Sequence, residues 1–409
     1  ASGPSSGSSG VGRRDPDRTP TPPVSRADPR TLAAVARLVA VVAQGGTAFV
    51  DALRAAWDAG DAVAPIDPRL PAPARAAVLD ALRPAVVLDP LDPGRTMTGA
   101  AAPDVDDGDA LVIPTSGTTG PPKGVVLTHA ALAAQAAAVH RHLGVGAGDR
   151  WLACLPLAHV GGLGVVVRAL VDGVDLEVHD RFDAAAVADA RDRGASLVSL
   201  VPTALDRVGA AGFRWVVLGG SADPVADRPA NVVRTWGMTE TGGGVVYGGR
   251  PLPGVEVTVV GDELHLRTPG VARGYRRSDG GVDRLPGRDG WYATGDAGSV
   301  AADGTVTVHG RLDDVIVTGG EKVWPDAVEA VLRRDPAVAE VAVAGRPDAE
   351  WGERVEAWVV PAPGAAAPGL DALRDRVRAE LPAWCAPRAV QVVDALPRTP
   401  LGKVRRRDL

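Results

Sequence analysis

The sequence predicts an α/β protein. A large N-terminal domain has mostly parallel, helix-covered sheets and a small antiparallel β unit, and a small α+β C-terminal domain follows. Between residues 110 and 235, short β-rich apolar runs alternate with Ala-rich helical stretches, which indicates parallel strands covered by helices. After residue 250, the runs VEVTVV and LHLRT alternate with period two on either side of GDE, as in a hairpin. Beyond about residue 313, strand and helix patterns mix again.

The elements follow in order along the chain. Residues 1–10 are rich in Ser and Gly, and residues 14–29 are rich in Pro and Arg without periodicity, so 1–29 are expected to be a disordered or artificial lead. Helices are predicted over 29–44 and 48–59. The N-terminal domain is expected to span 30–312. Further helices are predicted in it over 129–142 and 183–193. Its predicted strands are ALVIP, RWLACL, VDLEV, SLVSLV, FRWVVLG and NVVRT. The C-terminal domain, 313–409, is predicted to contain IVTG, PDAVEAVLRR, VAEVAVAG, RVEAWVV, LDALRDRVRAEL and AVQVV.

Composition excludes several classes of partner. Of the 409 residues, 45% are hydrophobic and 23% are charged, which is typical of a globular protein with a full core. The net charge of −6 argues against nucleic acid or an anionic membrane as the main partner. No apolar run approaches the roughly 18 residues of a membrane span, and nothing near the start resembles a signal peptide. Because Cys154 and Cys385 cannot build a disulfide framework, we expect a cytoplasmic protein.

Lysine is rare in this chain, since arginine supplies nearly all of the 44 cations. Only Lys123, Lys322 and Lys403 remain. Such survivors are candidates for positions where a compact, rotatable ammonium cannot be replaced by a planar guanidinium. Chance survival on the surface is the alternative for each.

A loop rich in Gly, Ser and Thr follows ALVIP and is expected to precede a helix. Its glycines let the backbone fold tightly, while its hydroxyls and lysine suit a polyphosphate. The spacing is not that of a Walker A loop, and by composition alone such a segment is more often an ordinary loop. Its residues are Thr115, Ser116, Gly117, Thr118, Thr119, Gly120, Pro121, Pro122, Lys123 and Gly124.

The order of residues in this loop resembles the phosphate loop of the adenylate-forming superfamily, which includes acyl- and aryl-CoA ligases, luciferases and peptide-synthetase adenylation domains. Other segments resemble this family in the family's order over roughly residues 45–409. They are GGS (219–221), WGMTE (236–240), RGY (273–275), YATGD (292–296), GRLDD (310–314) and LPRTPLGK (396–403).

The resemblance implies a role for each matched residue, with ATP, Mg²⁺ and CoA as the implied cofactor and cosubstrates. Thr239 contacts the α-phosphate, Glu240 holds Mg²⁺, Lys123 lies on the departing phosphates, and Lys403 bridges the carboxylate and the α-phosphate. Asp296 and Arg311 bind the ribose, and RGY is a structural signature. The adenine is bordered by Gly219, Gly220 and Ser221 and packs against Trp236, where the family commonly has Tyr.

Members of this family run two half-reactions: a carboxylate attacks ATP to give an acyl-adenylate and pyrophosphate, and a thiol then displaces AMP. The C-terminal domain is mobile and rotates between the two steps, so Asp313 is the expected hinge. Gly319 and Gly320 would then face the site on the CoA side. Lys322 lies beside them, as a CoA contact or as an ordinary surface lysine.

The phosphate loop lies early in the chain, which implies a truncated N-terminal subdomain. In this respect the chain resembles the compact actinobacterial o-succinylbenzoate–CoA ligases of menaquinone biosynthesis. Residues 241–252 (TGGGVVYGGRPL) and 156–163 (PLAHVGGL) resemble segments found there. These segments imply an acyl pocket that is lined by His159, Gly242, Gly243 and Gly244. The second carboxylate of that acid needs a donor, for which Arg168, Arg234, backbone amides or water are open choices.

Other functions stay open at this point. The runner-up enzyme is a ligase for another aryl or short acyl carboxylic acid, because the motifs are common to all such ligases. An adenylation domain that loads a carrier protein and a catalytically inactive binding protein are two further classes. A homodimer is possible.

Overall fold

The computed structural model describes residues 36–92, 97–98, 102–115, 122–220, 225, 227–398 and 404–409. The predicted lead, 1–29, lies outside the described residues. So do Ser116, Gly117, Thr118, Thr119 and Gly120 of the loop, together with Ser221 and Lys403.

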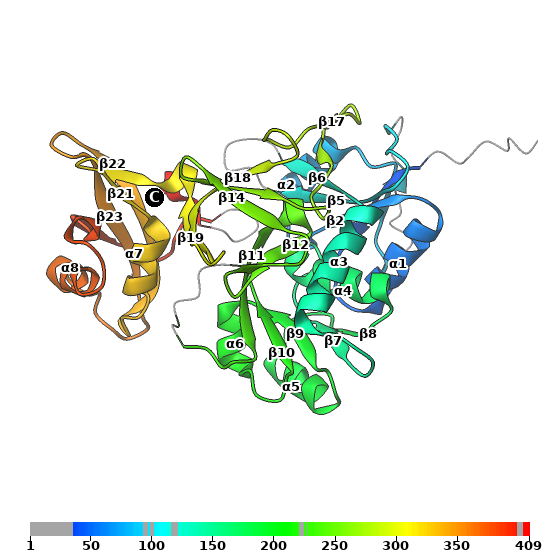
Figure 1. Ribbon diagram of the computed structural model, residues 1–409, viewed down its shortest axis with the longest axis horizontal. Helices are drawn as coiled ribbons and strands as arrows, with labels where there is room; N and C mark the ends of the chain where they lie inside the picture. Colours follow the sequence, from blue (N-terminus) through cyan, green and yellow to red (C-terminus); the bar gives the residue numbers. More distant parts are fainter. Residues whose placement is uncertain are drawn as a thin grey trace, which may run out of the picture. The chain divides into compact units, whose positions relative to one another are not determined.

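The first sheet contains the strands on both sides of the predicted phosphate loop (Figure 1). Strands β1, β2, β3 and β5 pair in parallel, whereas β6 pairs antiparallel with β5 and β16. The strand order is β17-β16-β6-β5-β2-β1-β3-β4. The strands are β1 (Leu38–Val42), β2 (Ala62–Ile66), β3 (Val86–Leu88), β4 (Met97–Thr98), β5 (Asp109–Thr115), β6 (Lys123–Thr128), β16 (Gly274–Arg276) and β17 (Val282–Asp283).

The helix predicted over 29–44 is wrong, because strand β1 occupies the described part of that segment. Every residue of LVAVV is buried, and β1 is paired on both sides, by β2 and β3. A continuous apolar run with three valines is typical of a parallel strand that is covered on both faces, and it carries no helical period. The next predicted helix, 48–59, is confirmed as α1 (Thr47–Asp58), which buries Phe49, Val50, Leu53 and Ala56 at helical spacing.

The predicted phosphate loop is followed by a strand and not by the expected helix. Thr115 ends β5 and pairs with Lys123, the first residue of the antiparallel strand β6. Helix α3 begins only at His129. The loop therefore joins two antiparallel strands, and a helix N-terminus directly after it cannot be part of its anion-binding chemistry.

The second sheet has the order β13-β12-β11-β10-β9-β7-β8, and it is parallel from β11 to β8. This confirms the predicted strands between residues 150 and 235. Strands β12 and β13 extend the sheet in the antiparallel direction. The bounds are β7 (Arg150–Ala153), β8 (Asp175–Val178), β9 (Leu197–Leu200), β10 (Trp215–Leu218), β11 (Val232–Met238), β12 (Gly243–Tyr247) and β13 (Arg250–Pro251).

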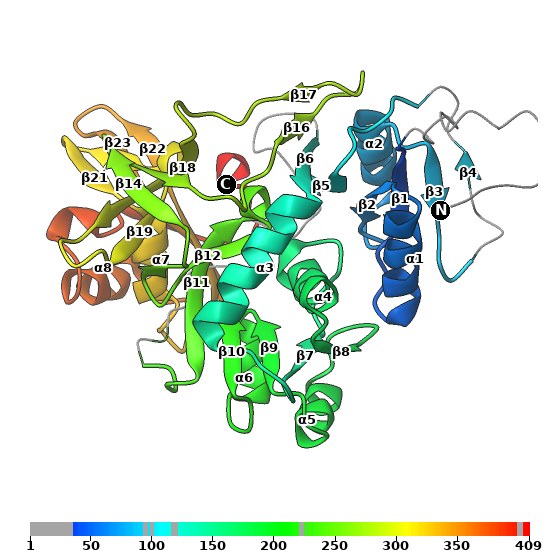
Figure 2. The same ribbon diagram turned by 45° about the vertical axis from the view of Figure 1, so that its right-hand side comes forward.

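Helices α3 and α4 pack against each other between the first two sheets (Figure 2). Thr128 caps α3 by accepting a hydrogen bond from the Ala131 N–H, and Gly144 ends the helix in the left-handed region. The apolar core runs from the first sheet through α4 to Trp151 and Tyr247. The helices of the first two sheets, besides α1, are α2 (Ala72–Leu82), α3 (His129–Leu143), α4 (Val160–Asp172), α5 (Ala184–Asp192) and α6 (Pro202–Val208).

A third, antiparallel sheet confirms the hairpin predicted after residue 250, since β14 and β15 pair around a turn at Gly261 and Asp262. Its order is β14-β15-β18-β19, with β14 (Glu256–Val260), β15 (Glu263–Arg267), β18 (Tyr292–Val300) and β19 (Val306–Arg311). The short 3-10 helix η2 (Thr239–Thr241) joins β11 and β12.

The remaining sheet lies in the C-terminal part and has a hydrophobic core of its own, from Ile316 to Ala386. A short 3-10 helix, η3 (Leu312–Asp314), precedes it, and the predicted mixture of strands and helices is confirmed. The elements are β20 (Ile316–Thr318), β21 (Glu321–Val323), α7 (Pro325–Leu332), β22 (Val338–Asp348), β23 (Gly352–Pro361), α8 (Leu370–Arg378), η4 (Ala383–Cys385), β24 (Ala389–Val392) and η5 (Arg406–Asp408).

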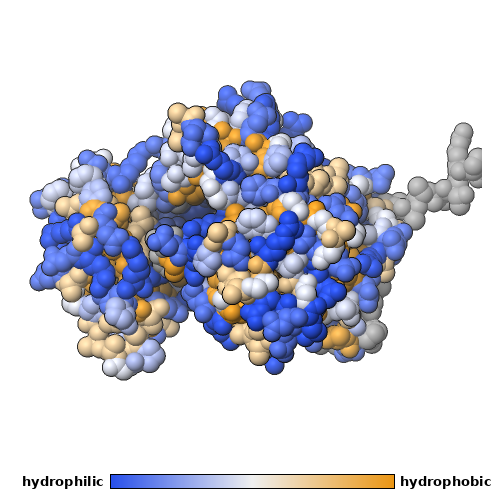
Figure 3. Space-filling model, turned by 60° about the horizontal axis from the view of Figure 1, so that its bottom comes forward, coloured by the Kyte–Doolittle hydropathy of each residue, from blue (hydrophilic) through white to orange (hydrophobic). Residues whose placement is uncertain are grey.

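No helix in the described ranges is both long enough and apolar enough to cross a membrane. On the face drawn in Figure 3, hydrophobic residues occur in small groups among hydrophilic ones.

Candidate active site

A cavity of about 350 Å³ lies where the ends of the second and third sheets meet β16. Two of the sequence-predicted residues, Glu240 and Arg311, line it, and so do the four residues of the YATGD segment before its aspartate. The full lining is Met238, Glu240, Glu263, Tyr275, Pro286, Tyr292, Ala293, Thr294, Gly295 and Arg311.

Asp296 is held from two sides at the edge of this cavity. The indole Nε1–H of Trp236 donates to Oδ2 at 2.8 Å, and Arg311 Nη1 donates to Oδ1 at 2.8 Å. Strands β18 and β19 place Asp296 directly opposite Arg311. Burial opposes the charge of Arg311, but the neighbouring carboxylate outweighs burial and raises the arginine pKa. The pair therefore presents a fixed carboxylate.

The turn before Asp296 is fixed by its own hydrogen bonds. The Gly295 N–H donates to Glu263 Oε1 at 2.7 Å, and the Asp296 N–H donates to Thr294 Oγ1 at 3.0 Å. Gly295 has φ 71°, and a Cβ there would lie 2.7 Å from Arg311 Nη2. The positive φ and the adjacent guanidinium both favour glycine at this position.

Glu240 and Tyr275 form a second group on the cavity wall, and Lys123 lies next to Tyr275. The Tyr275 hydroxyl donates to Glu240 Oε1 at 2.8 Å, and Lys123 Nζ lies 5.1 Å from the centre of the Tyr275 ring. Burial and the adjacent Glu240 raise the pKa of Tyr275, so the phenol stays protonated and donates. Because β16 pairs with β6, the RGY segment carries Tyr275 beside Lys123.

Glycines bring β11 and β12 unusually close together behind Glu240. A Cβ on Gly237 would lie 2.1 Å from the Gly243 carbonyl oxygen, so no larger residue fits there. Gly242 has φ 63°, and Thr241 Oγ1 donates to the Gly243 carbonyl oxygen at 2.6 Å. Thr239 begins this turn as the first residue of η2.

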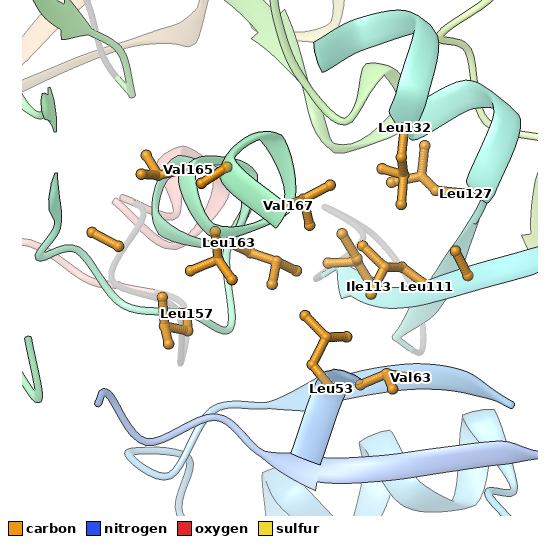
Figure 4. Close-up of a cluster of buried hydrophobic side chains, with 14 of the residues drawn as sticks. Leu53, Val63, Leu111, Ile113, Leu127, Leu132, Leu157, Leu163, Val165 and Val167 are labelled. Atoms are coloured by element: carbon orange, nitrogen blue, oxygen red, sulfur yellow. The ribbon is translucent and has the colours of Figure 1, made fainter. Parts of the chain in front are cut away.

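An apolar cavity of about 10 Å³ lies on the other side of the same turn. Leu163 and Val167 of α4 face Leu111 and Ile113 of β5 across it (Figure 4). An aryl group can enter only by displacing some of this lining. The complete lining is Leu111, Ile113, Leu127, Leu132, Val160, Leu163, Gly164, Val167 and Gly242.

Arg168 on α4 is a buried cation next to this apolar cavity, with 3% of its surface exposed. Its guanidinium lies over the Trp151 ring, 4.7 Å from the ring centre, and Nη2 is 3.4 Å from Ser199 Oγ. Among the described residues no carboxylate pairs with Arg168, and its Nε has no hydrogen-bond partner. A Cβ on Gly164 would lie 3.2 Å from Nη1, and one on Gly243 would lie 3.8 Å from it. The guanidinium therefore borders the glycine run.

His159 lines neither of these cavities. It caps α4, and its Nε2 is 3.2 Å from Asp67 Oδ2 and 3.4 Å from Arg69 Nη2. Burial opposes ionisation of Asp67, but the hydrogen bonds from Arg69 and His159 outweigh burial and hold its pKa below the ordinary value.

The remaining predicted residues that the structure describes lie elsewhere. Thr115 Oγ1 is 3.4 Å from the Lys123 carbonyl oxygen. Gly219 and Gly220 follow β10, beside the β11 strand that carries Trp236. Asp313 lies in η3, and Gly319 and Gly320 form the turn between β20 and β21 with positive φ. Lys322 makes an ion pair with Asp262 of the β14–β15 turn, away from the cavity lining.

The matched motifs contain most residues of the described cavity wall, but the sequence assigned a role in the site only to Glu240 and Arg311 among them. Tyr275 appeared only as part of a structural signature, and Glu263 was not singled out. The signal for Tyr275 was its place next to Arg273 and Gly274 in a matched motif. Nothing local marks Glu263, because its contact with Gly295 joins two separate strands.

Comparison with known proteins identifies the class. A family model described as AMP-binding enzyme matches residues 33–276, and one described as AMP-binding enzyme C-terminal domain matches 327–403. The chain belongs to the AMP-binding enzyme family.

Individual relatives narrow the comparison. A protein named probable 2-succinylbenzoate–CoA ligase, from Mycobacterium tuberculosis, is 40% identical over 360 residues, which are 82% of this chain and 92% of the relative. An indoleacetate–CoA ligase from Aromatoleum aromaticum is 35% identical over 342 residues, which are 73% of this chain and 66% of that one. The o-succinylbenzoate CoA synthetase of Bacillus subtilis, solved with the acyl-adenylate intermediate OSB-AMP, is similar with a TM-score of 0.81 and 26% identity, over 91% of this chain and 87% of that one. The same enzyme solved with ATP and a magnesium ion has a TM-score of 0.81 and 26% identity, over 91% and 89% of the two chains.

Proposed function

We propose that this protein joins 2-succinylbenzoate to CoA, consuming ATP and releasing AMP and pyrophosphate. Family membership supports the adenylate-forming chemistry. The observation that carries the choice of acid is Arg168, a buried guanidinium without a carboxylate partner among the described residues, beside the glycine run.

The large cavity fits the nucleotide. Asp296 keeps acceptor lone pairs for the ribose hydroxyls while Trp236 and Arg311 fix its orientation. Thr239 starts the turn that faces the α-phosphate, and Lys123 lies beside Tyr275 with its ammonium available to the departing phosphates. Gly219 and Gly220 border the adenine in this arrangement, next to Trp236.

Glu240 suits a magnesium ion that takes most of its ligands from phosphates and water. Within the described residues no group of three or more His, Cys, Asp or Glu side chains could hold a metal, so a protein-built cage is absent there. One carboxylate is sufficient for an ion of this kind. Tyr275 occupies one lone pair of Glu240 Oε1 and leaves Oε2 for the ion. When bound, magnesium neutralises phosphate charge.

The apolar lining of the small cavity and the adjacent Arg168 suit an aryl acid with a second carboxylate, provided that the lining side chains move apart to admit the ring. The cavity and the nucleotide site share the turn of residues 239–244, so an acid in the cavity has its reacting carboxylate near the α-phosphate. Arg168 would pair with the other carboxylate at the far end. Arg234 fits less well, because it donates to the Val225 carbonyl, which lines neither cavity.

The second half-reaction depends on the C-terminal part. We propose that the domain after residue 313 turns about Asp313, withdraws Lys403 and brings Gly319 and Gly320 to the thiol site. Lys322 fits the role of a surface ion-pair partner better than that of a CoA contact, because its ammonium is paired with Asp262. A homodimer and a cytoplasmic location stay predictions. Light scattering on the purified protein tests whether it is a homodimer.

A ligase for another aryl acid is the second candidate, favoured by the similarity to an indoleacetate–CoA ligase. The test supplies purified protein with ATP, CoA and a panel of acids, and measures AMP release. We expect the highest kcat/KM with 2-succinylbenzoate. Arg168→Ala should raise the KM for that acid by about tenfold or more, because truncation removes a charge-assisted pair. A higher kcat/KM with indoleacetate or benzoate would contradict the proposed acid.

A further inference from the structure

A line of side chains behind Arg168 reaches from the core to the edge of α4. The Asp172 carboxylate lies 2.6 Å from His140 Nδ1, and the Trp151 Nε1–H donates to His140 Nε2 at 3.0 Å. The Trp151 ring then carries the Arg168 guanidinium, 4.7 Å from the ring centre to Cζ. These contacts join α3, β7 and α4.

We propose that Trp151, oriented by His140 and Asp172, is a positioning residue that holds Arg168 charged and ready to bind the second carboxylate of the acid. This inference rests on the proposed function, because it needs an acid with two carboxylates.

Contact with the face of an aromatic ring explains why the N–H groups of Arg168 can stay available for a ligand. A buried cation is costly unless it is compensated, and a carboxylate partner would compensate it by occupying its N–H donors. The face of an indole attracts the cation without accepting hydrogen bonds from the guanidinium edge. Nε has no hydrogen-bond partner and Nη2 has only the long contact of 3.4 Å with Ser199 Oγ, so the edge of the guanidinium keeps donors for a ligand.

His140 fixes the plane of the indole. Nδ1 carries the proton toward Asp172, so Nε2 is the acceptor that the Trp151 N–H requires. Trp151 is fully buried and His140 is 7% exposed, so water cannot replace either contact easily. An indole that could rotate would present its edge to Arg168 and lose the attraction.

The experiment compares two acids that differ in one group. 2-Succinylbenzoate has the second carboxylate, and 2-butanoylbenzoate has a methyl group in its place. For Trp151→Leu we expect the KM for 2-succinylbenzoate to rise about tenfold at unchanged kcat, because Arg168 loses its cation–π contact with the indole ring. The KM values for 2-butanoylbenzoate and ATP should not change. His140→Leu should act in the same direction but less strongly, and His140→Gln, which keeps an acceptor, should restore the wild-type KM.

Trp215→Phe is the matched control. Its indole N–H also bonds to α3, at the Leu143 carbonyl oxygen and 3.0 Å away, but Trp215 does not contact Arg168. This control should leave the KM for both acids unchanged. Thermal unfolding of each variant identifies those that fail to fold. If Trp151→Leu fails, Trp151→Phe takes its place; it keeps a ring but loses the hydrogen bond to His140, so we expect a smaller rise in the KM for 2-succinylbenzoate and none for 2-butanoylbenzoate.

Each of the following outcomes would overturn the inference. Equal rises in KM for both acids would mean that Trp151 supports the fold of the pocket in general. An unchanged KM for 2-succinylbenzoate would mean that Arg168 does not depend on the contact with the Trp151 ring. A wild-type enzyme that does not adenylate 2-succinylbenzoate would overturn the proposed function, and the inference with it. If Arg168→Ala raised the KM for 2-succinylbenzoate selectively and Trp151→Leu did not, the inference would be overturned and the proposed function would stand.

Discussion

The indole nitrogen of Trp236 and the carboxylate of Asp296 lie 2.8 Å apart and are joined by a hydrogen bond. The sequence resemblance assigned Trp236 to the adenine and Asp296 to the ribose, as separate contacts. The structure joins them, because β11 ends next to β18. A tryptophan at this position therefore supplies a donor that orients the carboxylate as well as a flat ring.

Replacing Trp236 by Phe tests this relation. The variant keeps a flat ring but leaves Asp296 with Arg311 alone. A hydrogen bond to a charged group contributes about 1.5–3 kcal/mol, so we expect the KM for ATP to rise about tenfold or more. Steady-state kinetics with ATP and the acid varied in turn measure it. An unchanged KM for ATP would show that Arg311 orients Asp296 without help.

Replacing Tyr275 by Phe tests the support of Glu240. The hydroxyl that bonds to Glu240 Oε1 is removed, and the ring beside Lys123 is kept. Loss of such an outer contact to a metal-binding carboxylate commonly costs about 10–100-fold in metal affinity or activity. We expect the magnesium concentration for half-maximal activity to rise by about tenfold. A titration of activity against magnesium at saturating ATP decides the question, and an unchanged midpoint would contradict the assignment of Glu240.

Lys403 is predicted to act in the first half-reaction only. Lys403→Ala should lower adenylate formation by about 100-fold or more, because a positioned cation opposite developing negative charge is lost. Thiolation of a synthetic acyl-adenylate should stay at the wild-type rate. Pyrophosphate release follows the first step, and CoA consumption follows the second. Equal losses in both steps would refute this division.

The stability of the fold should depend on the protonation of His140. Burial lowers the pKa of His140 and the hydrogen bond with Asp172 opposes this effect only in part, so the folded imidazole is neutral where the unfolded one is charged. The unfolded state therefore binds the proton first, and folding loses stability as the pH falls below about 6.5.

His140→Gln removes this titration and keeps the acceptor for Trp151. We expect the free energy of unfolding of the wild type to fall, relative to that of the variant, between pH 8 and pH 5.5. Urea unfolding at the two pH values measures it. Parallel curves for the two proteins would show that His140 does not contribute.

Sequence alone determined the features that depend on neighbouring residues. The alternation of apolar runs between 110 and 235 and the period-two hairpin after 250 were sufficient to predict the strands of the second and third sheets. The order of the matched motifs was sufficient to identify the family, because each motif is a short continuous segment.

Tertiary structure alone decided the features that join distant segments. The helix predicted over 29–44 is wrong because that prediction rests on the Ala, Val and Leu content of the segment, whereas the pairing of β1 with a strand on either side is created by distant segments. The hydrogen bond between Tyr275 and Glu240 requires β16 to pair with β6. The choice of Arg168 over Arg234 depends on which guanidinium is buried against Trp151 beside the glycines, and no local pattern encodes a burial that helices and strands far apart in the chain create together.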